Sequence, residues 1–153
     1  MNFNELIGHI SNETFSDVIA IAPRKVRESL FSHYDIKTKG MLTLSKIKDK
    51  KEDRTKRLHE KLKLASNPKE QGFLKELFRN FLFTKRPMLK AALDFLGVEN
   101  DFGLVEVETD FFKELNQEKV IGLYNKLKSE FSKDEILIYL VFMETPFLDK
   151  III

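Results

Sequence analysis

Two oppositely charged segments hold the side chains of this sequence that could do chemistry. Residues 37–69 carry 12 cations against 4 anions, a net charge of +8. Amines and guanidinium groups at this density can neutralise the phosphates of a nucleic acid or the carboxylates of an acidic partner. The candidate contacts are Lys46, Lys48, Lys50, Lys51, Arg54, Lys56, Arg57, Lys61 and Lys63. Four acids are interspersed and the segment has no Phe, Tyr or Trp to stack on a base, so nucleic-acid binding is the alternative hypothesis rather than the first.

The second segment, residues 99–118, carries seven acids and one cation, a net charge of −6. Its candidate contacts with a basic partner are Glu99, Asp101, Glu106, Glu108 and Asp110. Paired carboxylates can also bind a divalent cation or share a proton in acid–base catalysis. Without a histidine or a nucleophile nearby, the pattern favours a solvated acidic face over a metal or catalytic site.

The composition narrows the remaining chemistry further. The chain has no cysteine, which excludes disulfides, thiolate nucleophiles and cysteine-ligated metals. Its three histidines, His9, His33 and His59, never stand at a helical metal-binding spacing, and we expect each to be partly exposed. No glycine-rich phosphate loop or His-Glu-x-x-His pattern occurs. We therefore predict a non-enzymatic protein with no catalytic residue, no cofactor and no metal.

Apolar residues at three- and four-residue spacing indicate the elements that position these charges. With 6 Gly and 4 Pro in 153 residues and little alternation, the sequence predicts an all-α fold. We expect a compact helical bundle of about five to seven helices in a single domain, residues 1–153. Its first helices should cover residues 3–10, 16–22 and 23–34.

Two antiparallel helical hairpins are predicted, over residues 67–97 and 116–144. The first begins at Asn67-Pro68, a cap followed by proline, and ends at Gly97. One face of its first helix carries six large apolar side chains: Phe73, Leu74, Leu77, Phe78, Phe81 and Leu82. Such a continuous stripe is typical of a helix packed on a core.

The second hairpin ends in a helix with no polar face. Asn116 should cap the helix before it, and Ser132 with Glu135 forms a capping box at its own start. Ile136 to Met143 is apolar on every side, which a surface helix of a monomer does not tolerate. This helix is therefore predicted to lie either in the middle of the bundle or at a dimer seam.

Three further segments carry weaker signals. Residues 48–57 contain no apolar side chain and should form a solvated basic helix or loop that projects from the domain. Residues 98–115 should form an extended connector that leads into a short helix from Thr109 to Leu115. The apolar tail, residues 147–153, should dock on its own bundle or on a second subunit.

The function that these features favour is protein–protein interaction, through the acidic connector, the basic arm or an apolar helix face. Residues 1–10 carry no cation and resemble no export signal, and the longest apolar run is too short to span a bilayer. We therefore expect a cytoplasmic protein without a membrane partner, with homo-oligomers possible through Ile136 to Met143 or through the tail.

The nucleic-acid alternative makes a prediction about salt. If the basic segment engages about five phosphates, log affinity for duplex DNA falls with log salt at a slope near −4 to −5. Replacing Lys50, Lys51, Lys56 and Arg57 with glutamine should flatten that slope without unfolding the protein. We expect instead binding weaker than about 100 μM at about 50 mM salt, because Asp49, Glu52, Asp53 and Glu60 repel the same phosphates. Tighter, strongly salt-dependent binding would favour the nucleic-acid hypothesis.

Overall fold

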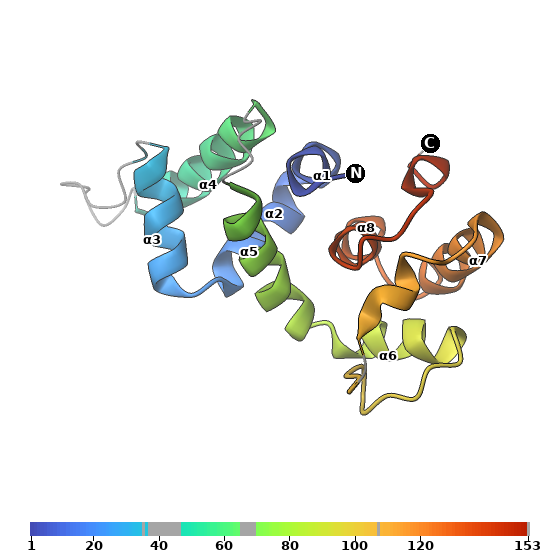
Figure 1. Cartoon of the computed structure of the whole chain (residues 1–153). Coiled ribbons are helices and arrows are strands. Elements are labelled where there is room, and N and C mark those ends of the chain that lie inside the picture. The colour runs from blue at the N-terminus through green and yellow to red at the C-terminus, as the bar shows by residue number, and fades with distance from the viewer. Residues whose placement is uncertain (35, 37–46, 65–69, 107, 153) are drawn as a thin grey trace.

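The computed structural model describes the chain except for residues 35, 37–46, 65–69, 107 and 153, and the side chains of residues 47–53. The described residues form an all-α bundle of eight α-helices, one more than the upper end of the expected range, and contain no strand (Figure 1). The elements are α1 (Phe3–His9), α2 (Asn12–Ile21), α3 (Arg24–His33), α4 (Ile47–Leu64), α5 (Gln71–Phe83), α6 (Arg86–Phe95), the 3₁₀ helix η3 (Thr109–Phe112), α7 (Gln117–Leu127), α8 (Lys133–Phe142) and the 3₁₀ helix η4 (Leu148–Lys150).

The helix ends follow the local capping signals of the sequence. Asn116 accepts a hydrogen bond from the backbone N–H of Lys119, and Ser132 with Glu135 forms the expected capping box. Gly97 follows α6 at φ +71°, the left-handed conformation that favours glycine. The second helix starts earlier than predicted, at Asn12, because the side chain of Ser11 caps it. The predicted caps at Asn67 and Pro68 lie outside the described residues.

Helix α8 occupies the centre of the bundle. Every side chain from Ile136 to Val141 is buried, none more than 4% exposed. Helices α1 and α5 pack against it, and Phe112 of η3 meets the ring of Tyr139 edge-on, with 5.6 Å between centroids. The tail adds Leu148 and Ile151 to the same core, which confirms that it docks on its own bundle. Of the two placements predicted for α8, the structure has the interior one.

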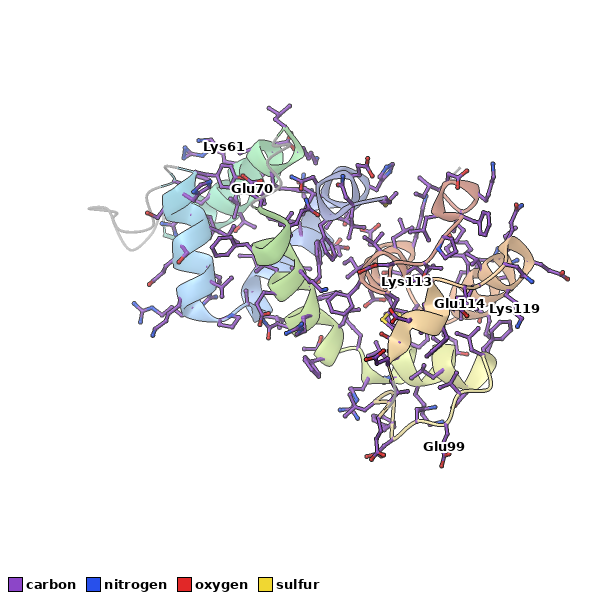
Figure 2. The ribbon with its side chains drawn as sticks, viewed as in Figure 1. Lys61, Glu70, Glu99, Lys113, Glu114 and Lys119 are labelled. Carbon is purple, nitrogen blue, oxygen red and sulfur yellow. The ribbon has the colours of Figure 1, made fainter. Side chains whose placement is uncertain are left out.

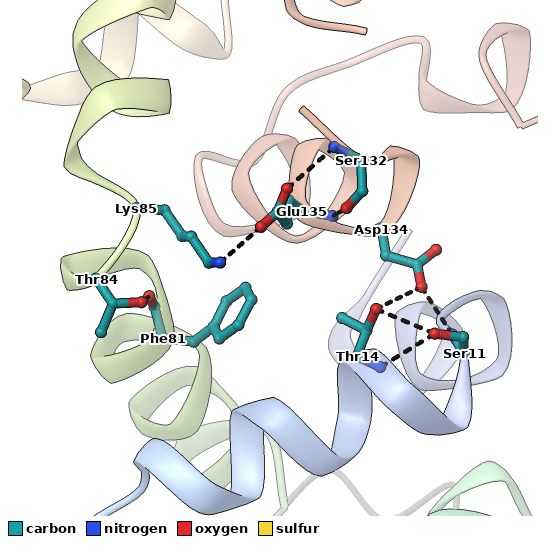
Figure 3. Close-up of polar contacts among 8 residues, drawn as sticks. All are labelled: Ser11, Thr14, Phe81, Thr84, Lys85, Ser132, Asp134 and Glu135. Atoms are coloured by element: carbon teal, nitrogen blue, oxygen red, sulfur yellow. Dashed lines mark hydrogen bonds and ion pairs between the residues drawn. The ribbon is translucent and has the colours of Figure 1, made fainter. Parts of the chain in front are cut away.

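The first turn of α8 fixes two distant parts of the chain (Figure 3). The carboxylate of Asp134 accepts hydrogen bonds from the backbone N–H of Ser11 and the hydroxyl of Thr14, at 2.9 and 2.8 Å. The carboxylate of Glu135 lies 2.6 Å from the amine of Lys85, in the link between α5 and α6. One helical turn thus joins the start of α2 to the end of α5.

The predicted hairpin over residues 67–97 has the expected helices, α5 and α6, but not the expected antiparallel packing. The helices predicted for the hairpin over residues 116–144 are α7 and α8. Helix α6 leaves the end of α5 at an open angle (Figure 1), and it packs mainly on α7, whereas α5 packs on α1, α2 and α8. The apolar faces of α5 and α6 therefore cover different neighbours instead of each other. Of the six apolar side chains predicted on one face of α5, Phe73 remains 51% exposed and the other five are buried, so the buried stripe is one residue shorter than the sequence predicted.

Residues 47–64 form one continuous helix, α4, so the segment 48–57, predicted to be a helix or a loop, is a helix. Leu58, His59 and Leu62 are fully buried against α1 and α2. Within the segment expected to be solvated, Thr55 is buried at 6% exposure, whereas Lys56 and Arg57 are exposed. Thr55 is small enough to continue the buried stripe of α4 by one turn. The side chains of Lys48, Lys50 and Lys51, and the whole of Lys46, lie outside the described residues.

His59 is fully buried, and the expectation of a partly exposed histidine is wrong here. Its ring stacks on Phe15 with 4.5 Å between centroids. Nε2 lies 2.9 Å from the carbonyl oxygen of Ile7 and Nδ1 lies 2.5 Å from the side-chain amide of Asn12. Because a carbonyl only accepts, Nε2 donates that bond, and the ring joins α4 to both α1 and α2.

Protonation of His59 should destabilise the fold. Burial lowers the pKa of His59 below its ordinary value of 6.5, although the hydrogen bond with Ile7 acts in the opposite direction. As the pH falls below 6.5, the His59 imidazole binds a proton in the unfolded chain but remains neutral in the folded chain until a lower pH. The unfolded state is therefore favoured, and the free energy of unfolding falls. Urea titrations between pH 7.5 and 5.5 should show a weaker pH dependence in His59→Leu than in the wild type. His9→Gln, at an exposed histidine of α1, should keep the wild-type dependence, and equal slopes in all three proteins would contradict the prediction.

Candidate protein-interaction surface

The acidic connector, residues 98–108, is held against α6 by one arginine. Arg86 donates from Nε to the carbonyl oxygen of Phe102 at 2.6 Å and from a terminal nitrogen to the carbonyl oxygen of Asp101 at 3.1 Å. Its guanidinium also lies 5.6 Å from the centre of the Phe102 ring. These charge-assisted bonds fix the backbone of the connector without neutralising any of its carboxylates.

A tight turn at Asn100 to Leu104 shapes the connector. The side-chain oxygen of Asn100 accepts from the N–H of Gly103 at 2.9 Å, and Asp101 and Leu104 exchange backbone hydrogen bonds. Gly103 has φ +83°, and a Cβ there would lie 2.8 Å from Cβ of Leu89 and 2.9 Å from the carbonyl oxygen of Arg86. Glycine is required at this position by its conformation and by the close approach of α6.

All five carboxylates predicted to contact a basic partner are exposed. Asp110 pairs with Lys113 at 3.0 Å, and Lys113 also pairs with Glu144 at 2.9 Å. The other four, Glu99, Asp101, Glu106 and Glu108, hold no ion pair with any residue that the structure describes. Glu99 is directed away from the helices at the outer edge of the connector (Figure 2). The structure thus brings the predicted acidic residues together on one solvent-facing segment.

An apolar cleft lies beside this acidic segment, and sequence reasoning did not find it. The apolar side chains of the cleft come from α5, α6, the connector and the end of α8: Leu82, Phe83, Leu89, Leu93, Leu104, Val105, Phe142 and Met143. Its volume is about 190 Å³. The lining residues span the sequence from Arg79 to Met143, so no local pattern marks them.

Phe102 stands exposed next to the cleft in an unfavourable backbone conformation. It has φ +45° and its side chain is 52% exposed. A non-glycine residue in this region costs of order 1–3 kcal/mol, and such residues cluster at functional sites. Leu104 and Phe83, which line the cleft, are also exposed, at 41% and 54%. The connector therefore presents large apolar groups and carboxylates to solvent together.

The described part of the basic segment is partly neutralised. Lys61 donates to the carbonyl oxygen of Tyr34 at 2.7 Å, and Lys63 pairs with Glu60 at 3.1 Å. Arg54 and Arg57 also make contacts within the protein. Lys56 is exposed on α4. The side chains of the remaining candidates, Lys46, Lys48, Lys50 and Lys51, lie outside the described residues.

The described residues contain no cluster of three or more His, Asp or Glu side chains arranged to hold a metal ion. Within the same residues, no helix combines the length and apolar character needed to cross a membrane. Comparison of the chain with protein-family models, with curated proteins and with solved structures gave no match. The surface chemistry is therefore the basis for a functional proposal.

Replacing Gly103 with alanine should loosen the connector. The added Cβ meets backbone and Cβ atoms that cannot move aside, and φ +83° is strained for alanine, so we expect a loss of roughly 1–3 kcal/mol in unfolding free energy. Thermal unfolding measures the loss. Gly72→Ala is the matched control, because Gly72 lies in α5 with open space around it and should tolerate alanine or gain stability. Equal melting temperatures for Gly103→Ala and the wild type would contradict the tight docking of the connector.

Proposed function

We propose that this protein is an interaction module that binds a basic segment of a partner protein carrying a large apolar side chain. The apolar cleft receives the apolar side chain, and the carboxylates of the acidic connector attract the basic groups that flank it. The observation that carries the proposal is the position of four exposed carboxylates, which form no ion pair with a described residue, on the segment that also forms one wall of the cleft.

The size of the cleft supports a side chain as its occupant. The volume of the cleft is about 190 Å³. Small-molecule sites usually measure about 300–1,000 Å³. A cleft below that range is suited to one anchoring side chain of a larger partner, the arrangement typical of interface hot spots.

The charges beside the cleft support a basic partner. Glu99, Asp101, Glu106 and Glu108 are exposed, and the guanidinium of Arg86, which holds the connector, donates to backbone carbonyls. Arg79 at the rim of the cleft pairs with Glu76 at 3.4 Å. A partner with lysines or arginines would therefore be steered to this surface, and its affinity would fall with salt.

A selection from a random displayed-peptide library on the immobilised full chain tests the proposal. The enriched peptides should combine a positive net charge with at least one large apolar residue. Phe83→Ser should weaken their binding at least about tenfold, because it removes an exposed wall of the cleft while leaving the core intact. The double variant Glu106→Gln, Glu108→Gln should weaken binding mainly at low salt.

Matched controls lie on α7, outside the cleft. Ile121→Ser removes an apolar side chain that is 36% exposed, and Glu118→Gln removes an exposed carboxylate. Both should bind the selected peptides as the wild type does. Peptides that are neutral or acidic, or that bind Phe83→Ser unchanged, would contradict the proposal.

A further inference from the structure

A larger pocket lies at the opposite end of α5, between that helix and α3. Its volume is about 730 Å³, within the usual range for small-molecule sites. Its walls include Lys25, Ser29, His33, Tyr34, Glu70 and Phe73. None of these residues belongs to the apolar cleft or to the acidic connector, so this pocket is a separate feature.

Glu70 gives the pocket its chemical character. It lies at the N-cap position of α5 (Figure 2) and its side chain is 8% exposed. Its Oε2 is buried and has no hydrogen-bond partner, and its Oε1 lies 3.8 Å from Nε2 of His33, beyond hydrogen-bond distance. The 3.8 Å separation is within ion-pair distance, so Oε2 is the oxygen left without a hydrogen bond, and burying such an oxygen is unfavourable. The missing interaction is one that a cation would supply.

Aromatic and hydroxyl groups complete the wall around this carboxylate. The hydroxyl of Tyr34 is buried and has no hydrogen-bond partner at ordinary distance and angle. Burial raises the pKa of Tyr34, and the adjacent Glu70 carboxylate raises it further by accepting a weak hydrogen bond from the phenol and by its charge, so the phenol stays protonated beside the carboxylate. Phe73, 51% exposed on the same wall, offers a ring face that attracts cations.

We propose that this pocket binds an ammonium or guanidinium group, with the Glu70 carboxylate as its counter-ion and the rings of Tyr34 and Phe73 beside it. The cation comes either from a small amine or from a lysine or arginine side chain of a partner. Lys25 and His33 are the cationic residues of the wall. Both are exposed, whereas the carboxylate is buried.

Titrations monitored by amide chemical shifts test this site with defined probes. Butylammonium and butylguanidinium chloride should shift the amides around Tyr34 and Glu70 saturably, whereas butanol, the neutral counterpart, should not. Glu70→Gln, which removes the charge at constant size, should weaken cation binding at least about tenfold. Glu76→Gln is the matched control, because Glu76 is an exposed acid of the same helix outside the pocket.

A capped Ala-Lys-Ala tripeptide distinguishes the two sources of the cation. Binding at least about tenfold tighter than that of butylammonium would assign the pocket to a partner's side chain, and equal or weaker binding would assign it to a small amine. Lys25→Gln should bind the cations as tightly as the wild type or tighter. Equal shifts with butanol, unchanged binding in Glu70→Gln, or binding that appears only in Lys25→Gln would overturn the proposal. Phe83→Ser, which tests the cleft, should leave this binding unchanged.

Discussion

A helix with no polar face must be surrounded, and the burial of α8 is the constraint on which the rest of this fold depends. Six consecutive side chains of α8, Ile136 to Val141, are removed from water. At ~1.5–3 kcal/mol for each large apolar side chain, this burial contributes on the order of 10 kcal/mol before the entropy of folding is counted. Helices α1 and α5, η3 and the tail are arranged to cover it.

Polar groups at the first turn of α8 fix how this buried helix is positioned against its neighbours. Burial acts to raise the pKa of Glu135, but the ion pair with Lys85 and the hydrogen bonds with Ser132 outweigh it and hold the pKa below its usual range. The carboxylate of Asp134 accepts hydrogen bonds from the backbone N–H of Ser11 and the hydroxyl of Thr14 at the start of α2. The last turn of α8 differs: Phe142 and Met143 are only half-buried and line the apolar cleft. The same helix thus organises the core and forms part of the proposed interaction surface.

The sequence predicted those features that depend on neighbouring residues. The caps at Asn116 and Ser132, the left-handed Gly97 and the all-apolar character of α8 are local signals, and the structure confirms them. The prediction that the two helices of 67–97 pack antiparallel is wrong. Helix α5 packs on α8 and α6 packs on α7, and these partners, which are distant in sequence, determine the angle between α5 and α6. His59 appeared unremarkable in sequence because its partners, Ile7 and Asn12, lie about fifty residues away.

Of the candidate sites, one could be predicted from the sequence and two could not. Composition alone located the acidic connector, since a run of carboxylates is visible without a fold. It did not locate the apolar cleft beside the connector, nor the pocket around Glu70, because each is assembled from several helices. Glu70 in particular has the sequence context of an ordinary surface acid, but it is buried at the start of α5, where it lines the pocket together with residues of α3.

Native-state hydrogen exchange, measured amide by amide at two protein concentrations, tests the central role of α8 most directly. If α8 is the interior of a single chain, the amides of Ile138 to Val141 exchange only through global unfolding, at a free energy that is independent of concentration. The amides of the more peripheral α3 should exchange through smaller openings. Exchange of α8 as fast as that of α3, or protection of α8 that rises with protein concentration as at a dimer seam, would contradict this account.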